Sequence, residues 1–97
     1  MYDIEFGETA KRDLKWFKKY EQKIILDGID DNLKYEPNVE TQNRKQMRPN
    51  PVAEWELRIG KFRVLYNVEE TVKIVSIEVI GIKVGSDFVI RGEKRDL

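Results

Sequence analysis

Apolar and polar residues alternate over the first few residues of the chain. In the segment YDIEF, residues 2–6, the side chains of Tyr2, Ile4 and Phe6 fall on one face of an extended backbone. This period of two is typical of a half-buried strand. Because Gly7 ends the pattern, we expect a short strand there and a different element after it.

The apolar spacing then changes to that of a helix. Thr9 is a suitable N-cap, and Ala10, Leu14 and Phe17 follow on one stripe. We interpret the lysines of this segment as a solvated helix face: Lys11, Lys15, Lys18 and Lys19.

A second helical pattern follows a break near Tyr20 and Glu21. Its apolar face consists of Ile24, Ile25, Gly28, Ile29 and Leu33. Gly28 weakens a helix by about 1 kcal/mol relative to alanine, and we interpret it as a place where the two helices approach closely. The segment EPN, residues 36–38, ends the pattern. The two helices are therefore predicted to form an antiparallel hairpin.

Residues 39–54 are the least regular part of the chain and are predicted to be a loop. Pro49 and Pro51 exclude a helix or a central strand there. Residues 55–59 and 62–68 then alternate as two strands, and Gly60-Lys61 between them suits a type II′ turn.

The remaining sequence predicts one central strand and a weak C-terminal end. Residues 72–80 are apolar at most positions, which is typical of a strand covered on both faces. After Gly81 the segment FVIR predicts a short edge strand, and GEKRDL predicts a frayed tail. The whole order predicts one α+β domain over residues 1–97. In this two-layer domain the N-terminal strand and a helical hairpin pack on an antiparallel sheet.

The composition narrows the chemistry that is available. The chain has no cysteine and no histidine, so disulfides, thiolate zinc sites and histidine acid–base catalysis are excluded. We expect neither a metal nor a cofactor. No apolar run approaches the roughly 18 residues that span a membrane, and the N-terminus lacks a signal-peptide pattern. A cytoplasmic protein without a membrane partner is the expectation.

The net charge of zero hides an uneven distribution. Residues 1–42 carry 7 Lys/Arg and 10 Asp/Glu, a balance of −3, and residues 43–97 carry 11 and 8, a balance of +3. A basic cluster stands out against Glu54 and Glu56: Arg44, Lys45, Arg48, Arg58, Lys61 and Arg63. A local basic patch on a neutral protein indicates an anion site rather than a general coat for nucleic acid.

The predicted hairpin sets Arg58 directly opposite Arg63. Like charges at facing strand positions destabilise a sheet, so the pair needs an explanation. One explanation is a bound phosphate, because two guanidinium groups offer forked donors that match its oxygens. Lys61 at the hairpin tip and Lys83 after the central strand would then face the same anion, with Arg48 reaching it from the preceding loop. The other explanation is an ordinary surface on which Glu56 or Glu78 bridges one arginine.

The segment LRIGKFRVLY, residues 57–66, resembles the RelE/ParE superfamily of bacterial toxin–antitoxin toxins. In that family a strand, a glycine-containing turn and an arginine that opens the next strand follow a helical hairpin. Arg63 matches this arginine, KQMRPNP matches a basic loop before the sheet, and GIKVGSDFVIRGE matches the C-terminal ending in part. The resemblance covers nearly the whole chain.

The resemblance implies a function. Members of the RelE branch cut messenger RNA in the ribosomal A site without a metal, through attack of the ribose 2′-OH on the adjacent phosphate. By position, Arg58, Arg63 and Lys83 would be the catalytic residues, and Lys45, Arg48 and Lys61 would bind substrate. The partners implied are a cognate antitoxin, the ribosome and messenger RNA. Glu56 or Glu54 is a candidate base.

Two alternatives remain open at the level of sequence. The family's C-terminal tyrosine or histidine, its proton donor, should fall near Phe88 or Val89, and neither can donate a proton. This departure favours a ParE-like toxin that acts on a protein target such as DNA gyrase. The second alternative is a degenerate member that only binds its antitoxin.

Overall fold

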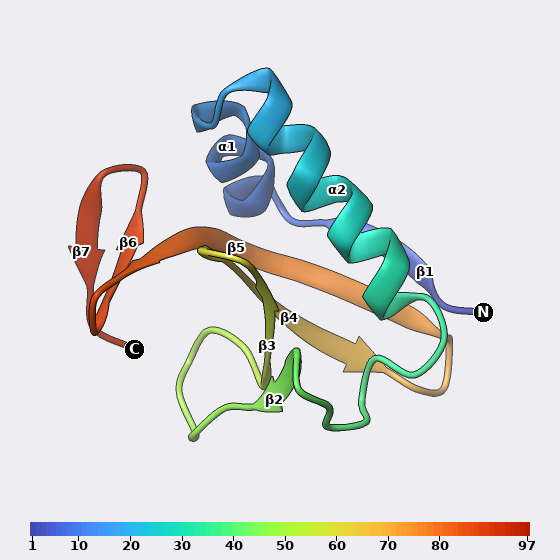
Figure 1. Cartoon of the computed structure of the whole chain (residues 1–97). Helices are drawn as coiled ribbons and strands as arrows, with labels where there is room; N and C mark the ends of the chain where they lie inside the picture. Colours follow the sequence, from blue (N-terminus) through green and yellow to red (C-terminus); the bar gives the residue numbers. More distant parts are fainter.

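Two helices lie on one face of a single seven-stranded sheet (Figure 1). The computed structural model describes all of residues 1–97. The elements follow one another as β1 (Asp3–Phe6), α1 (Glu8–Trp16), α2 (Lys19–Leu33), β2 (Arg44–Gln46), β3 (Trp55–Ile59), β4 (Phe62–Glu69), β5 (Ile74–Val84), β6 (Asp87–Ile90) and β7 (Glu93–Arg95). The predicted α+β class and its two layers are confirmed. None of the helices has the length and apolar character needed to cross a membrane.

Strand β5 organises the sheet. The order is β2-β3-β4-β5-β6-β7 with antiparallel neighbours, and β1 joins β5 as a parallel strand. Because β4 occupies one edge of β5, the other edge is shared: β1 pairs with residues 74–77 and β6 with residues 82–84. The central strand is apolar on both faces because the helices cover one face, over Val75, Ile77 and Ile80, and a second cluster with Val79 covers the other.

The main core lies between the helices and the sheet. Phe17, Ile25 and Ile29 from the helical layer pack with Leu57 and Val64 from the sheet. Leu57 lies directly opposite Val64, as the predicted two-residue turn requires. The turn itself has Gly60 at φ +57°, while Lys61 has no positive φ, which is the type II′ pattern.

A β-bulge after Leu65 gives the opposite face of the sheet a core of its own. The pairing of β4 with β5 shifts between Leu65 and Tyr66, so both side chains are fully buried on different sides. Tyr66 enters the main core, where its hydroxyl donates to Pro37 O at 2.6 Å and burial raises its pKa. Leu65 packs with a small cluster on the other face: Ala53, Val79 and Ile90.

Two segments that were predicted to be irregular are strands. Residues 44–46 form β2, although residues 39–54 were expected to be a loop. The backbone of residues 44–46 pairs with β3, but the segment has no alternating apolar pattern from which the strand could be predicted. Residues 93–95 form β7 where a frayed tail was expected, so β6 is not the edge strand. The turn between β6 and β7 depends on Arg91 at φ +46° and Gly92 at φ +79°, and an arginine is an unusual residue in that conformation.

The helix ends also differ from the prediction. Helix α1 begins at Glu8 with Gly7 as its N-cap, so Thr9 lies inside the helix. The break falls at Phe17 and Lys18 rather than near Tyr20. There the backbone N–H of Lys18, the N-cap residue of α2, donates to the Glu21 carboxylate at 3.1 Å, so this N–H has a hydrogen-bond acceptor.

Gly28 makes room for the sheet rather than for the other helix. A Cβ at this position would lie 2.5 Å from Ile59 Cδ1 on β3. Helix propensity alone predicts that Gly28→Ala stabilises the protein by about 1 kcal/mol. We expect the reverse, a loss of about 1–3 kcal/mol in the free energy of unfolding, because the new Cβ would lie within 3.0 Å of three carbon atoms of the half-buried Ile59 side chain.

Urea unfolding of Gly28→Ala measures this effect. Gly28→Ala combined with Ile59→Val, which removes Cδ1, should recover part of the loss. A single variant more stable than the wild type would mean that α2 and β3 are less closely packed than described.

Candidate functional site

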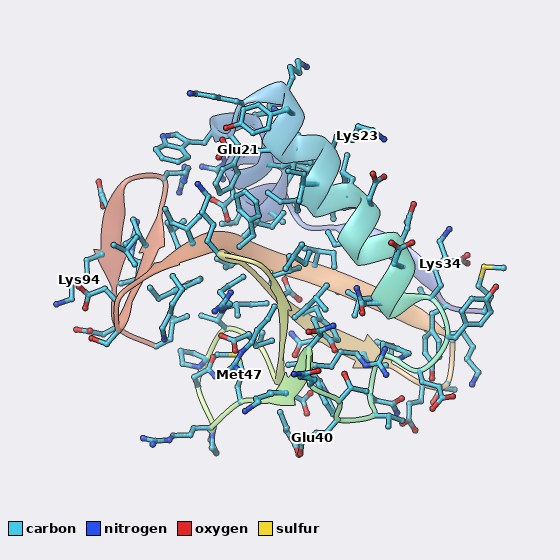
Figure 2. The ribbon with its side chains drawn as sticks, in the orientation of Figure 1. Glu21, Lys23, Lys34, Glu40, Met47 and Lys94 are labelled. Carbon is cyan, nitrogen blue, oxygen red and sulfur yellow. The ribbon has the colours of Figure 1, made fainter.

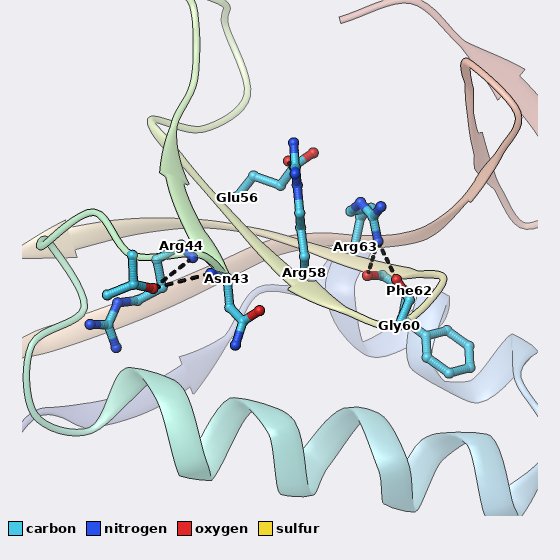
Figure 3. A network of polar contacts seen from close by, with 8 residues as sticks. Asn43, Arg44, Glu56, Arg58, Gly60, Phe62 and Arg63 are labelled. Carbon is cyan, nitrogen blue, oxygen red and sulfur yellow. Dashed lines mark hydrogen bonds and ion pairs between the residues drawn. The ribbon is translucent and has the colours of Figure 1, made fainter.

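Arg58 and Arg63 face each other across β3 and β4, as the sequence predicted. Their apolar neighbours Leu57 and Val64 point into the main core, so the two arginines lie on the face of the sheet away from the helices. Figure 3 shows both side chains rising from the strands on the side opposite α2. The register argument is therefore confirmed.

The Arg63 guanidinium is anchored to its own turn. Its Nη1 donates to Gly60 O at 2.6 Å and to Phe62 O at 2.9 Å, and no carboxylate lies within 4.0 Å of it (Figure 3). Burial lowers the pKa of Arg63, while the charge of Glu56 raises it and that of Arg58 lowers it. The remaining N–H groups of the guanidinium have no protein acceptor, so they are available to an anion.

Arg58 has an acidic partner. Its Nε lies 3.2 Å from Glu56 Oε1, and the Glu56 side chain is only 18% exposed. The interpretation in which Glu56 bridges one arginine is therefore confirmed for Arg58. Glu78 does not bridge either arginine: the ion pair of Arg58 is with Glu56, and Glu78 accepts a hydrogen bond from Asn67 Nδ2 at 3.1 Å. Only one of the two arginines is neutralised by the protein.

Two hollows meet at Glu56. One, of 290 Å³, is lined by Lys45, Arg48 and Arg58 together with the loop after β2. The other, also of 290 Å³, lies between the sheet and the β6–β7 hairpin. It is lined by Phe88 and by three cations, Lys83, Lys94 and Arg95. Met47 and Glu56 belong to both hollows, and Figure 2 shows Met47 below the sheet and Lys94 on the outer hairpin. Together the two hollows present six cations and three acidic side chains, Glu56, Asp87 and Asp96, and Glu56 is the acidic side chain that they share.

Two predicted site residues, Arg63 and Lys61, line neither hollow. Arg63 lies opposite Arg58, which lines the first hollow, whereas the structure places Lys61 elsewhere. Its Nζ lies 3.5 Å from Glu21 Oε2 on α2 and 5.4 Å from the centre of the Phe62 ring. The tip of the hairpin is therefore tied to the helical layer, away from the arginine pair. Lys83 lies within β5 rather than after it, and it faces the second hollow.

Two cations of the site were missed by sequence reasoning. Lys94 and Arg95 were assigned to a frayed tail, but β7 brings them to the rim of the second hollow. Each is near an exposed carboxylate, Lys94 at 3.4 Å from Asp87 and Arg95 at 3.4 Å from Glu93. The segment GEKRDL has neither apolar alternation nor alternating charge, so the sequence holds no local signal for this strand.

The position of the expected proton donor is occupied by Phe88. Its ring packs over Gly81. A Cβ added to that glycine would lie only 2.9 Å from Phe88 Cζ. Gly81 is paired with Arg63, so the ring ends next to the arginine pair. No tyrosine lines either hollow.

A buried aspartate holds the hairpin that forms one wall of the site. Asp13 on α1 is fully buried, accepts a hydrogen bond from Ile80 N at 3.0 Å and lies 3.0 Å from Arg91 Nε. The Ile80 N–H lies in the gap between β1 and β6 on the edge of β5, so no strand can satisfy it. Burial raises the pKa of Asp13, and the hydrogen bond and Arg91 oppose that shift.

Comparison with known proteins identifies the fold. No protein-family model and no curated protein matches this chain. The toxin–antitoxin complex RelBE2 from Mycobacterium tuberculosis matches 81% of this chain and 94% of its own at 24% identity, with a TM-score of 0.70. The RelE–RelB complex from Pyrococcus horikoshii matches 87% and 97% at 21% identity, with a TM-score of 0.68. The YoeB dimer from Staphylococcus aureus matches 79% and 91% at 20% identity, with a TM-score of 0.53.

Proposed function

We propose that this chain, which has the fold of the RelE and YoeB proteins, is the toxin of a type II toxin–antitoxin pair. Its activity in this proposal is metal-independent cleavage of messenger RNA on the ribosome, in the cytoplasm. The observation that carries the proposal is the unneutralised Arg63 opposite Arg58, which lines a hollow together with Lys45 and Arg48 on the open face of a RelE fold. The antitoxin of the pair, the ribosome and messenger RNA are the proposed partners.

The reaction needs three contributions from the protein. The ribose 2′-oxygen attacks the adjacent phosphorus, the P–O5′ bond breaks, and the products are a 2′,3′-cyclic phosphate and a free 5′-hydroxyl. The proton of the 2′-OH leaves to a base, and the 5′-oxygen gains a proton. The extra negative charge on the phosphate must be stabilised between these steps.

The side chains of the site can supply two of these contributions. Arg58 and Arg63 hold the phosphate from facing strands, and Lys83 adds positive charge from the neighbouring strand. Glu56 is the base in this proposal, because it is the carboxylate shared by both hollows. Glu54 is less suitable, since it lines neither of them.

The third contribution distinguishes this chain. Phe88 has no proton to donate, so the 5′-oxygen takes its proton from water in our proposal, and cleavage is slow. Phe88→Tyr should therefore raise the cleavage rate about tenfold or more, because a positioned acid contributes 10²–10⁴-fold in favourable cases. The new hydroxyl would extend from Cζ, which lies over Gly81 next to Arg63.

Primer extension on messenger RNA cut in the presence of purified ribosomes measures this rate. Phe88→Leu serves as the matched control, since it changes the side chain without adding a proton donor. A Phe88→Tyr variant no faster than the wild type would show that departure of the 5′-oxygen does not limit the reaction.

The same assay tests the function itself. We expect cuts at A-site codons that depend on both the protein and the ribosome and that persist in EDTA-treated protein. We favour this activity over a ParE-like action because RelE and YoeB proteins are among the structures that share the fold. Intact message, together with inhibition of supercoiling by purified DNA gyrase, would overturn the proposal in favour of a protein target.

A further inference from the structure

The β6–β7 hairpin is attached to the rest of the molecule at its base and at its tip. At the base, residues 87–89 of β6 pair with residues 82–84 of β5, and Ile90 packs into the small cluster of the open face. Strand β7 pairs only with β6, and its other edge has no strand beside it. Figure 1 shows the tip of the hairpin beside α1. The placement of Lys94 and Arg95 on β7 therefore depends on what holds the tip.

Two contacts with α1 hold this tip. Asp13 Oδ1 lies 3.0 Å from Arg91 Nε, and a Cβ added to Gly92 would lie 3.6 Å from Trp16 Cζ2. Asp13 is fully buried, and its Oδ2 accepts a hydrogen bond from Ile80 N–H at 3.0 Å. Its Oδ1 accepts no hydrogen bond, and Arg91 is the one cation within 4.0 Å of it. The carboxylate is thus fixed to β5 on one side and faces the arginine of the hairpin on the other.

The backbone of the tip indicates that the Arg91 side chain has a role of its own. Arg91 has φ +46°, a conformation that glycine adopts easily and that residues with a side chain rarely adopt. A glycine would therefore suit the turn better than an arginine does. The contact of the guanidinium group with Asp13 offsets this local strain.

The hairpin and the arginine pair contribute differently to the proposed site. Lys94 and Arg95 line the second hollow from the hairpin. The cations assigned to the reacting phosphate are Arg58, Arg63 and Lys83, which lie on β3, β4 and β5. The contacts at the tip do not hold any of these three strands to its neighbour. A displaced hairpin would therefore lose contacts to the message while the reacting groups stay in place.

We propose that Asp13 is a positioning residue for RNA binding, and that it acts through Arg91 to hold the β6–β7 hairpin against the substrate. This inference rests on the proposed function and adds to it a residue that does not itself touch the message. With the tip held, Lys94 and Arg95 contact backbone phosphates beside the one that is cleaved. With the tip released, the hairpin pivots on its short pairing with β5, and these contacts are lost.

Steady-state cleavage on purified ribosomes tests the proposal, with message-bound ribosomes as the varied substrate. One test variant is Arg91→Gly, which removes the guanidinium group and suits the left-handed backbone. The other is Asp13→Asn, which keeps an acceptor for Ile80 N–H. Their combination leaves no buried charge without a partner. The matched control is Lys73→Gly, which removes an exposed cation from the other non-glycine residue with positive φ, outside both hollows.

The two kinetic constants should respond differently. We expect KM to rise about tenfold in both single variants and in their combination, because charged contacts to phosphate are lost, while kcat stays within about twofold of the wild type. The combination should be no worse than either single variant, because Asp13 and Arg91 act as one unit. Lys73→Gly should keep both constants. A partly unfolded variant would instead show a lower kcat at an unchanged KM.

Acrylamide quenching of tryptophan fluorescence measures the position of the hairpin without any substrate. Trp16, which lies against Gly92, is 51% exposed, whereas Trp55 is only 8% exposed, so quenching reports mainly on Trp16. Quenching should increase in both single variants and in their combination, and it should not change in Lys73→Gly. Circular dichroism of each variant measures the folded fraction at the assay temperature.

The outcomes separate this proposal from the function on which it rests. Wild-type constants in the combined variant would overturn the positioning role and leave the cleavage activity in place. A loss confined to kcat and proportional to the unfolded fraction would also overturn it, because Asp13 would then be structural only. A raised KM with unchanged quenching would show that the hairpin had not moved, which contradicts the proposal. A wild type that cuts no message would overturn the proposed function and the role of Asp13 in it.

Discussion

Asp13→Ala should lower the free energy of unfolding by about 3 kcal/mol, which is the low end of the range for breaking a buried ion pair. The low end applies because Arg91 is partly exposed, at 35%. The substitution removes the only acceptor of the Ile80 N–H and the only carboxylate near Arg91. A domain of this size loses roughly 4–8 °C in melting temperature per kcal/mol, so the expected decrease is large. Thermal unfolding followed by circular dichroism measures it.

Two further variants separate the charge from the hydrogen bond. Asp13→Asn keeps an oxygen that can accept from Ile80 N–H, so it should lose less stability than Asp13→Ala. Arg91→Gln leaves the Asp13 carboxyl buried without its positive partner, which raises the pKa of Asp13 further above its ordinary value. If Asp13→Ala were as stable as the wild type, the contact would not hold the hairpin.

The pH dependence of Arg91→Gln follows from this pKa shift. A carboxyl whose pKa is higher in the folded state than in the unfolded state contributes stability below its unfolded pKa, and this contribution is lost as pH rises through the folded pKa. The stability of Arg91→Gln relative to the wild type should therefore decrease as pH rises from the acidic range toward neutrality. Urea midpoints across that range measure the effect, and a constant difference would contradict it.

The hairpin and its arginine pair could be predicted from sequence because several constraints agreed there. The alternation of residues 55–59 and 62–68 and the Gly60-Lys61 turn leave one register, and a shift by one residue would reverse every side chain. The helical stripes were predicted in most positions: Ala10, Phe17, Ile25 and Ile29 are buried as expected, whereas Ile24, which was assigned to the same apolar face, is 45% exposed.

The segments that were missed depend on contacts distant in sequence. Strand β2 is polar, and only its backbone pairing with β3 defines it. Strand β7 requires a turn with Arg91 in a left-handed conformation, and Asp13 holds that arginine from the other end of the chain. Because Asp13 and Arg91 are far apart in the sequence, local spacing could not show that Lys94 and Arg95 join the site. For the same reason it could not show that Lys61 pairs with Glu21 on α2.

The arginine pair allows stability and activity to be separated. Arg63→Ala should lower cleavage of ribosome-bound message by about 10- to 150-fold, because a hydrogen bond to a charged group contributes roughly 1.5–3 kcal/mol. Its stability should decrease by about 1 kcal/mol at most. The two hydrogen bonds to Gly60 and Phe62 are lost, but the repulsion from Arg58 is removed as well.

Parallel measurements of cleavage, growth inhibition and melting temperature make this comparison. Arg58→Ala should also lose cleavage, and it leaves Glu56 without its partner. Arg12→Ala is the matched control, because this exposed arginine on α1 lies outside both hollows of the site. If activity falls only in proportion to a large loss of stability, Arg63 has a structural role. Stable variants with full activity would exclude a phosphate between the arginines, and the like-charge pair would then have to be explained by binding to a protein target.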